Sequence, residues 1–445
     1  MSESPQPNLA ALAGAKGWKL ADAAHLLRRA GFGGGPSEIA AAHAAGLEAT
    51  LTRIFSPPAE SDEFASADRS LRSAAIGAND PKQLKAWWLY RMRHSTAPLA
   101  EKLALLWHNH FATSIEKVRK TELMARQNDL FRRNGAGSFR DLLQAVAKDP
   151  AMLLWLDGND NRKRAANENF AREVMELFSL GIGNYSEKDI REAAKSFTGW
   201  HVRDDEFWLE EGQHDRGPKT IFGKTGRFSG EDAIDLCVAQ PACARFIALK
   251  LLRGFATDRP TPDAIAAIAA LLKRNDYHVG RTLRTLLASE YFFGPTCRGA
   301  IVKGPVDFAI GALRALEVNP NFNRVVELLA SLGQDVFQPS TVKGWDGGRQ
   351  WIGAATLLVR TQFAAALLGG ESYGVTPDPS ATLAKMQGTG ASESLPAWES
   401  CLLARPLDAD RRTAANAFLT KIPREEDRER AALHLLLTAP EFQLL

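Results

Sequence analysis

Ionisable and amide side chains recur at three- and four-residue steps along one stretch of the chain, from Asn169 to Glu176. This spacing predicts that they share one face of a helix. On that face Glu173 could transfer a proton, while Arg172 and Asn169 could hold an anionic group of a substrate. On spacing alone the favoured interpretation is a solvated helix face, on which an Arg172–Glu176 ion pair would contribute only about 0.3–0.5 kcal/mol.

A second group of ionisable residues lies in the stretch QHDRGPK, residues 213–219. His214 could serve as a general acid or base, with Asp215 orienting its ring and Lys219 contacting an anion. Constrained loops that carry several such groups often hold functional sites, and the alternative is a charged surface turn. Together the two stretches predict one polar pocket, with Glu173, His214 and Asp215 as catalytic residues and Asn169, Arg172 and Lys219 as substrate-binding residues.

A divalent metal is the one cofactor that the sequence suggests, with His110 and Glu176 as candidate ligands. His110 belongs to the stretch WHNHF, in which His108 lies two positions earlier. On a helix these two rings point to nearly opposite sides, so they do not share an ion. His110 would bind a metal only if the fold brought Glu173 or His214 close to it. A hydrogen-bonded core histidine is the competing interpretation.

The loop that precedes the Asn169–Glu176 stretch partly matches a calcium-binding loop. Residues at positions 1, 3, 5 and 12 of that pattern are Asp157, Asn159, Asn161 and Glu168. Arg162 stands where the pattern requires glycine, and it would place a cation beside the ion. The other interpretation is a polar turn that caps the next helix through Asn167.

A glycine-rich run, GFGGGP at 31–36, could offer backbone amides to a phosphate. It follows a helix rather than a strand and lacks the Lys-Ser/Thr ending, so it is not a P-loop. A connection between two helices is the favoured interpretation.

Apolar residues at helical spacing dominate the rest of the chain. Helices are predicted at Asp22–Arg29, Lys82–His94, Leu99–Thr113, Glu168–Leu180 and Glu187–Phe197, and at many later positions; Ser186 and Asp189 form a capping box. Only the region 201–222 has strand-like patches and turn residues. The predicted fold class is therefore mainly α: one large multi-helix domain over 19–445, with a small β-hairpin or loop insertion near 201–222 and a disordered tail over 1–18.

Bulk composition excludes several functional classes. The 55 basic and 52 acidic residues give a net charge of +3, which is too balanced for a nucleic-acid partner. No run approaches the 18 apolar residues of a membrane span. The four cysteines form no CxxC pair, and no signal peptide is seen. These features predict a cytoplasmic protein with reduced thiols.

Six stretches together resemble one bacterial family, the DUF1800 family of unknown function. They are AAHLLRRAGFG, LALLWHNHF, NENFAREVMELFSLG, YSEKDIREAAKSFTGW, HDRGPKTIFG and KGW followed by a later Trp, and they span about residues 20–444. The resemblance implies a shared site at the family's recurrent polar positions, which fall here on His110, Asn167, Glu168, Asn169, Arg172, Glu173, Glu176, His214, Asp215 and Lys219. Family members are typically exported and often encoded beside sulfatase-like proteins, and the missing export signal departs from that pattern.

Two functions from different classes follow from these residues. The first is an enzyme of hydrolase or transferase type that acts on a small-molecule or glycan-like anionic substrate. The second is a non-catalytic helical protein that binds or assembles with a protein partner, in which the same residues form a structural polar network.

Overall fold

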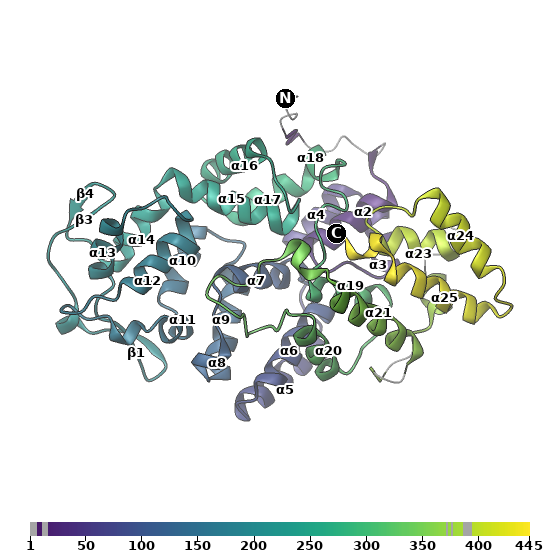
Figure 1. The fold of residues 1–445 in the computed structure, drawn as a ribbon, viewed down its shortest axis with the longest axis horizontal. Helices are drawn as coiled ribbons and strands as arrows, with labels where there is room; N and C mark the ends of the chain where they lie inside the picture. The colour runs from purple at the N-terminus through teal and green to yellow at the C-terminus, as the bar shows by residue number, and fades with distance from the viewer. Residues whose placement is uncertain (1–6, 11–16, 371–372, 375–376, 386–393) are drawn as a thin grey trace.

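The computed structural model describes residues 7–10, 17–370, 373–374, 377–385 and 394–445 of the chain (Figure 1). Within these residues the chain forms 24 α-helices and two small antiparallel sheets. This confirms the mainly helical fold class. Buried apolar side chains form one contiguous cluster that runs from Ala23 to Phe442. No helix in the described part of the chain is long and apolar enough to cross a membrane.

The helices spread along one long axis in Figure 1. The left-hand end contains α10 (Phe139–Ala147), α11 (Pro150–Trp155), α12 (Glu168–Glu173), the π-helix η2 (Val174–Leu180), α13 (Glu187–Ser196) and α14 (Gly230–Val238). The central region contains α5 (Asp62–Gly77), α6 (Pro81–His94), α7 (Pro98–His110), α8 (Ile115–Val118), α9 (Thr121–Asn134), α15 (Pro241–Phe255), α16 (Pro262–Arg274), α17 (Val279–Ala288) and α20 (Phe322–Ser331).

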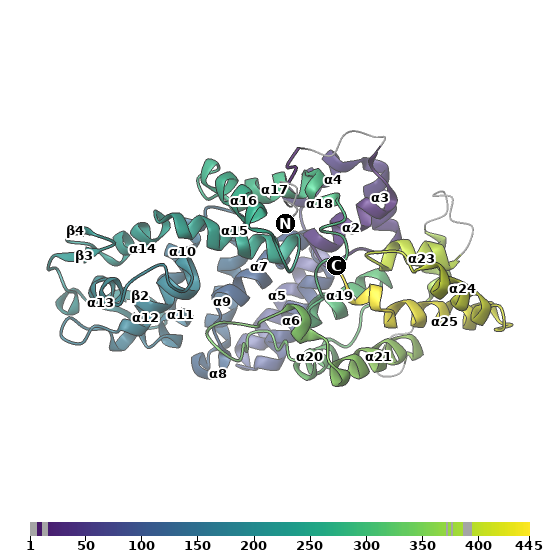
Figure 2. The ribbon, with the colours of Figure 1, turned by 45° about the horizontal axis from the view of Figure 1, so that its top comes forward.

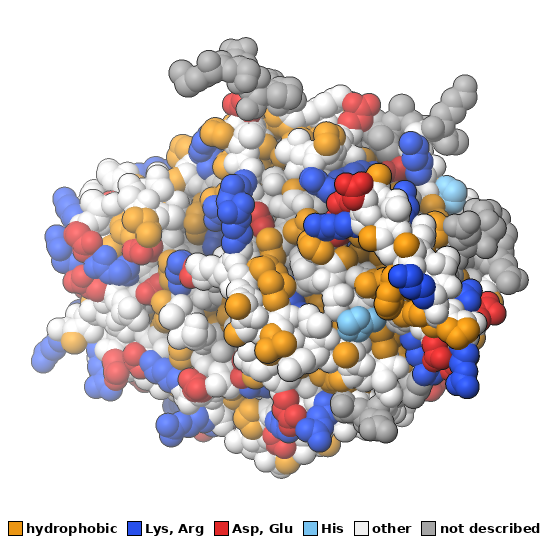
Figure 3. All heavy atoms as spheres, turned by 45° about the vertical axis from the view of Figure 1, so that its right-hand side comes forward, with side chains coloured by type: hydrophobic (Ala, Val, Ile, Leu, Met, Phe, Trp, Pro, Cys, Tyr) orange, Lys and Arg blue, Asp and Glu red, His pale blue; other side chains and the backbone are white. Residues whose placement is uncertain are grey.

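Toward the right-hand end, helices from the two halves of the sequence lie together. They are α2 (Leu20–Ala30), α3 (Pro36–Ala45), α4 (Leu47–Phe55), α18 (Glu290–Phe293), α19 (Pro305–Ala315), α21 (Ala354–Gly369), α22 (Pro379–Ala384), α23 (Ser394–Leu402), α24 (Ala409–Leu419) and α25 (Glu425–Thr438). Figures 1 and 2 both place α2 beside α23, and the two helices are in contact. Basic and acidic side chains intermingle over the face that Figure 3 shows.

The predicted β region contains two hairpins rather than one. Strands β1 (Trp200–Arg203) and β2 (Glu206–Leu209) pair in one, and β3 (Lys219–Ile221) and β4 (Lys224–Gly226) pair in the other. Both two-residue turns have positive φ angles, at Asp204 and Asp205 and at Phe222 and Gly223, as tight hairpin turns require. The second hairpin extends beyond residue 222, the end of the predicted region.

Local sequence signals set the helix ends. The predicted capping box is present, because the Ser186 hydroxyl accepts from the Asp189 amide while the Asp189 carboxylate accepts from the Ser186 amide. The glycine run connects α2 to α3, as predicted.

Of the tail predicted to be disordered over 1–18, residues 1–6 and 11–16 lie outside the described residues. The carbonyls of Asn8 and Ala10 accept from amides of α18.

A fully buried carboxylate joins the central helices. Glu101 of α7 accepts from Trp88 Nε1 at 3.0 Å, from Arg91 Nε at 2.9 Å and from Arg132 Nε at 2.7 Å. Burial alone would raise the pKa of Glu101, but Arg132 and Arg91 lower it below its usual value. Arg91 also pairs with Asp68 of α5 at 2.7 Å, so one network fastens α5, α6, α7 and α9 together.

A second buried carboxylate, Asp149, caps α11. It accepts from the Met152 amide at 3.2 Å and from Gln127 Nε2 at 2.7 Å. It has no ion pair among the described residues. Burial therefore dominates and raises the pKa of Asp149 to about 7, despite the partial offset from its hydrogen bonds and from Arg126.

Candidate functional site

Glu173 stands where α12 changes into the π-helix η2. Asn167 starts α12, because its side chain accepts from the Asn169 amide at 2.9 Å. Phe170 and Val174 are buried and hold the segment against the core, which leaves the carboxylates on the other side. A π-helical turn is rare and often accompanies a functional site, since it shifts the side chains that follow it out of α-helical register.

The Glu173 carboxylate is partly buried, and within the described residues it makes no hydrogen bond or ion pair. Burial and the negative charge of Glu176 raise its pKa, against a smaller opposing effect of Arg172. Glu176 differs, because the Tyr185 hydroxyl donates a hydrogen bond to it. Two neighbouring carboxylates thus have different environments, which is the arrangement that separates an acid from a base in many enzymes.

Arg172 is held by Glu187 of α13 through two parallel hydrogen bonds of 2.9 and 2.8 Å. Asn169 is exposed on the preceding turn. Asn169, Arg172 and Glu173 lie on α12 and Glu176 lies on η2. Among the described residues Arg172 pairs with Glu187 rather than with Glu176, and the structure adds Tyr185 as the partner of Glu176. Neither Tyr185 nor Glu187 follows helical spacing, so the pattern of α12 alone could not have indicated them.

Replacing Arg172 with alanine is expected to leave the midpoint of thermal unfolding within about 1 °C of the wild type. The reason is exposure: 35% of the Arg172 side chain and 60% of the Glu187 side chain are accessible to water. Differential scanning calorimetry measures this midpoint. A fall of many degrees would instead mean that Arg172 belongs to a structural network.

The 213–219 loop uses its ionisable groups to hold its own backbone. His214 Nδ1 lies 2.8 Å from the Thr198 carbonyl, and the Asp215 carboxylate accepts from the Gly217 amide at 2.7 Å. Lys219 is 1% exposed, and its ammonium donates to the carbonyls of Asp215 and Gly217. Burial lowers the pKa of Lys219. These contacts favour a structural role for the loop.

The chain just after the loop and the α12 segment both contact α13. Thr220 and Phe222 donate their amides to Glu192 and Asp189, at 3.0 and 2.7 Å, and Asp189 lies in the same first turn as Glu187, the partner of Arg172. Among the described residues no hydrogen bond or ion pair joins the predicted site residues of α12 and η2 to those of the loop. The sequence predicted a single pocket built from both segments, but none of these contacts joins the two segments directly.

His110 is a core residue in this fold. It is 3% exposed, and its Nε2–H donates to the Phe178 carbonyl at 2.9 Å. Its ring packs against Trp107, Phe111, Phe139, Phe178 and Phe246. Burial, and then Lys250, lower its pKa well below the usual value. In the part of the chain that is described, no three His, Cys, Asp or Glu side chains are grouped to hold a metal, so His110 and Glu176 lack a ligand set there.

The loop before α12 forms a polar turn that caps this helix, which was the alternative to a calcium-binding loop. Asp157 pairs with Lys117 at 2.8 Å, and the buried Asn161 accepts from the Asn167 amide at 2.8 Å. Asp157 and Asn161, two of the residues that a calcium ion would need, therefore serve the fold. Asn167 caps α12, as that interpretation requires.

A small cationic cavity on the right-hand side of the molecule was not predicted from the sequence. It is lined by residues that include Arg28, Gly34, Lys303, Asp307 and Phe442. These residues come from α2, from the glycine run, from α19 and the residues just before it, and from the C-terminal segment. The one available signal was the basic pair Arg28 and Arg29 directly before the glycine run, and the ordinary interpretation of such a pair is a solvated helix end.

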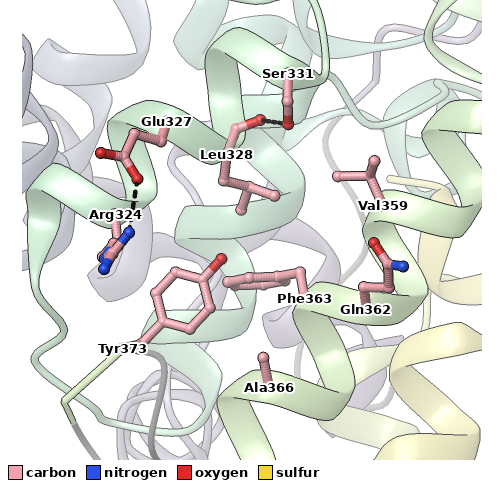
Figure 4. A pocket seen from close by; sticks show the side chains of 9 residues that line it. All are labelled: Arg324, Glu327, Leu328, Ser331, Val359, Gln362, Phe363, Ala366 and Tyr373. Carbon is pink, nitrogen blue, oxygen red and sulfur yellow. Dashed lines mark hydrogen bonds and ion pairs between the residues drawn. The ribbon is translucent and has the colours of Figure 1, made fainter.

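A larger hollow lies between α20 and α21, with Tyr373 at its side (Figure 4). Its volume is about 490 Å³, and it is open to solvent. Phe363 and Tyr373 stack edge to face at its wall. The charged residues at its rim, Arg324 and Glu327, pair with each other at 3.2 Å. The hollow therefore presents no buried charge to a ligand.

Comparison with known proteins gives a family and no activity. Residues 25–444 match the family model described as a protein of unknown function, DUF1800. No curated protein and no solved structure matches the chain. Since the match covers most of its length, the chain belongs to the DUF1800 family, as the six stretches of sequence had implied.

Proposed function

We propose that the protein is an enzyme of hydrolase or transferase type that acts on an anionic substrate, with Glu173 as its proton-transfer group. The observation that carries this proposal is the Glu173 carboxylate itself. It is partly buried and has no partner among the described residues, and burial and Glu176 raise its pKa. A carboxyl group with a raised pKa is better suited than an ordinary one to give a proton to a leaving group and to take one from an incoming nucleophile.

The neighbouring residues fit supporting roles. Glu176, which accepts from Tyr185, supplies a negative charge that adds to the effect of burial in raising the pKa of Glu173. Arg172 already holds one carboxylate in a two-point geometry, which also suits a phosphate, a sulfate or a substrate carboxylate. Because Glu187 is exposed, a substrate anion can replace it on Arg172 without opening the core. Asn169 adds an amide on the same face.

Replacing Glu173 with glutamine is expected to lower kcat/KM at least about 100-fold, because the amide cannot transfer the proton. The assay is turnover of chromogenic phosphate, sulfate and carboxylate esters and of anionic glycosides by the full chain. Glu231→Gln is the matched control, since Glu231 is a partly buried carboxylate of α14 that pairs with Lys148. Turnover that survives Glu173→Gln, or that falls equally in both variants, contradicts the proposed role.

A second candidate is the non-catalytic binding or assembly protein. The 213–219 loop supports it, because His214, Asp215 and Lys219 all contact the backbone of the loop or of Thr198. On this candidate neither the wild type nor Glu173→Gln turns over any of these substrates, and the two proteins bind ligands equally. The two candidates therefore give opposite results in the same assay.

A further inference from the structure

A small, partly enclosed cavity lies where α2, the glycine run, α19, α23 and the C-terminal segment meet. Its free space is about 20 Å³ for the centre of a water-sized sphere, which admits a water or a group of a few atoms. It shares no residue with the Glu173 site and is independent of the proposed enzymatic function.

Lys303 places a buried amine at this cavity. The residue is 2% exposed, and its backbone is fixed by the Gln443 carbonyl at 2.8 Å and by Arg360 Nη2 at 2.8 Å. Its Nζ lies 3.5 Å from the ring centre of Phe442 and donates to no acceptor within the described residues. Buried lysines are rare and are normally paired, so this amine lacks the acceptors that its position requires.

Arg28 adds a second buried cation with unused donors. It is 5% exposed and donates from Nη1 to the Cys401 carbonyl at 2.9 Å, whereas its Nε has no partner among the described residues. The amide of Gly34, which also lines the cavity, likewise has no acceptor in the described part of the chain. Lys303, Arg28 and Gly34 thus line one space, together with Asp307.

The charges around Lys303 do not balance. Arg28, Arg360 and Lys102 lie near it, and all three are buried, while Asp307 is the acidic side chain that acts on it among the residues that the structure describes. Asp307 is already paired with Lys102. Burial and the nearby cations lower the pKa of Lys303 well below its usual value. Uncompensated buried charge is costly, and here the missing charge is negative.

We propose that this cavity binds a tetrahedral oxyanion, phosphate or sulfate, between Lys303 and Arg28. The oxyanion is either a free ion or the terminal group of a larger molecule that reaches out of the cavity. Lys303 supplies a point charge, Arg28 a planar fork of donors and Gly34 a backbone amide, which is a donor set that suits phosphate oxygens. The bound anion supplies the negative charge that the described side chains lack.

Isothermal titration calorimetry of the full chain tests the proposal with inorganic phosphate and sulfate, at constant ionic strength in chloride. We expect saturable binding at one site, and at least about tenfold weaker binding by Lys303→Met and by Arg28→Gln. Phenyl phosphate separates the two sources, since its binding shows that the cavity takes a terminal group, and its failure to bind shows a site for the free ion. No binding up to about 10 mM, or equal affinity in wild type and Lys303→Met, overturns the proposal.

Lys219→Met is the matched control, because Lys219 is equally buried but its ammonium is satisfied by backbone carbonyls. It is expected to bind phosphate as the wild type does. Loss of binding in Lys219→Met but not in Lys303→Met would move the anion site to the 213–219 loop and overturn the assignment.

Thermal unfolding provides a second test. Circular dichroism first confirms that Lys303→Met is folded. Without anion, this variant is expected to unfold at least about 1 °C above the wild type, because it removes an unpaired buried amine. Saturating phosphate is expected to raise the midpoint of the wild type and of Lys219→Met by at least about 2 °C more than that of Lys303→Met. An equal rise in all three is the general stabilisation that phosphate gives any protein, and it would overturn the site.

Discussion

Replacing Glu101 with alanine is expected to lower the free energy of unfolding by about 3–5 kcal/mol, the usual cost of removing one partner from a buried ion pair. Glu101 is fully buried and accepts from Trp88, Arg91 and Arg132. Without it, two guanidinium groups at the centre of α6, α7 and α9 lose their carboxylate. Urea unfolding followed by circular dichroism measures the change.

Glu122→Ala serves as the control for this experiment. Glu122 lies on α9, as Arg132 does, but it is exposed, so its loss is expected to change stability by no more than about 0.5 kcal/mol. A change below about 1 kcal/mol for Glu101→Ala would show that the lost carboxylate is replaced by water, by Asp68, which pairs with Arg91, or by Asp129, which pairs with Arg132.

Replacing Asp149 with asparagine is expected to stabilise the protein above pH 7 by on the order of 2–4 kcal/mol. Burial raises the pKa of Asp149 to about 7 from a usual value of 3.8. Between these two values the folded protein retains the proton and the unfolded chain has lost it, so the wild type loses stability as the pH rises from about 4 to about 7. Asparagine stays neutral and still caps α11.

The informative quantity is the difference in unfolding free energy between the two proteins as a function of pH. Burial lowers the pKa of His25, His108 and His110, so both proteins lose stability as the pH falls through the usual histidine range, and the difference cancels this shared effect. We expect the difference to be near zero at pH 4 and to grow toward pH 7. A difference that is constant from pH 4 to pH 8 would show that Asp149 is ionised in the folded protein throughout.

The helices could be predicted because their causes are local. The apolar spacing of Lys82–His94 and Glu187–Phe197 matches α6 and α13 within about a residue at each end, and the box of Ser186 and Asp189 starts α13 as expected. The second β-hairpin was predicted only in part. Lys224–Gly226 is polar and short, so its strand pairing depends on the turn at Phe222 and Gly223 and gives no alternating apolar pattern.

The candidate site was predictable only where its residues share one helix. Asn169, Arg172, Glu173 and Glu176 follow helical steps, and they lie on α12 and η2. Contacts between residues that are distant along the chain leave no periodic pattern in the sequence, so they could not be predicted.

Charged residues in a helix can be buried without any sign in the local sequence. Arg28 of α2 resembles a solvated helix end, yet its acceptor is the Cys401 carbonyl and its cavity includes Lys303. For the same reason, nothing near Lys219 in sequence indicated that its ammonium would bind the carbonyls of its own loop.

The partners of α2 have a consequence for the synthesis of the protein. Arg29 donates to the carbonyls of Ala256 and Cys297, and Arg28 donates to that of Cys401. A ribosome adds about 5–20 residues per second, so roughly 20–70 s separate the appearance of Arg28 from that of its acceptor. During that interval α2 can pack on α3 and α7 but not on α23, and the Arg28 guanidinium stays hydrated because its acceptor has not been made. We therefore expect the last cooperative folding step to follow translation of α23, and the growing chain to depend on chaperones until then.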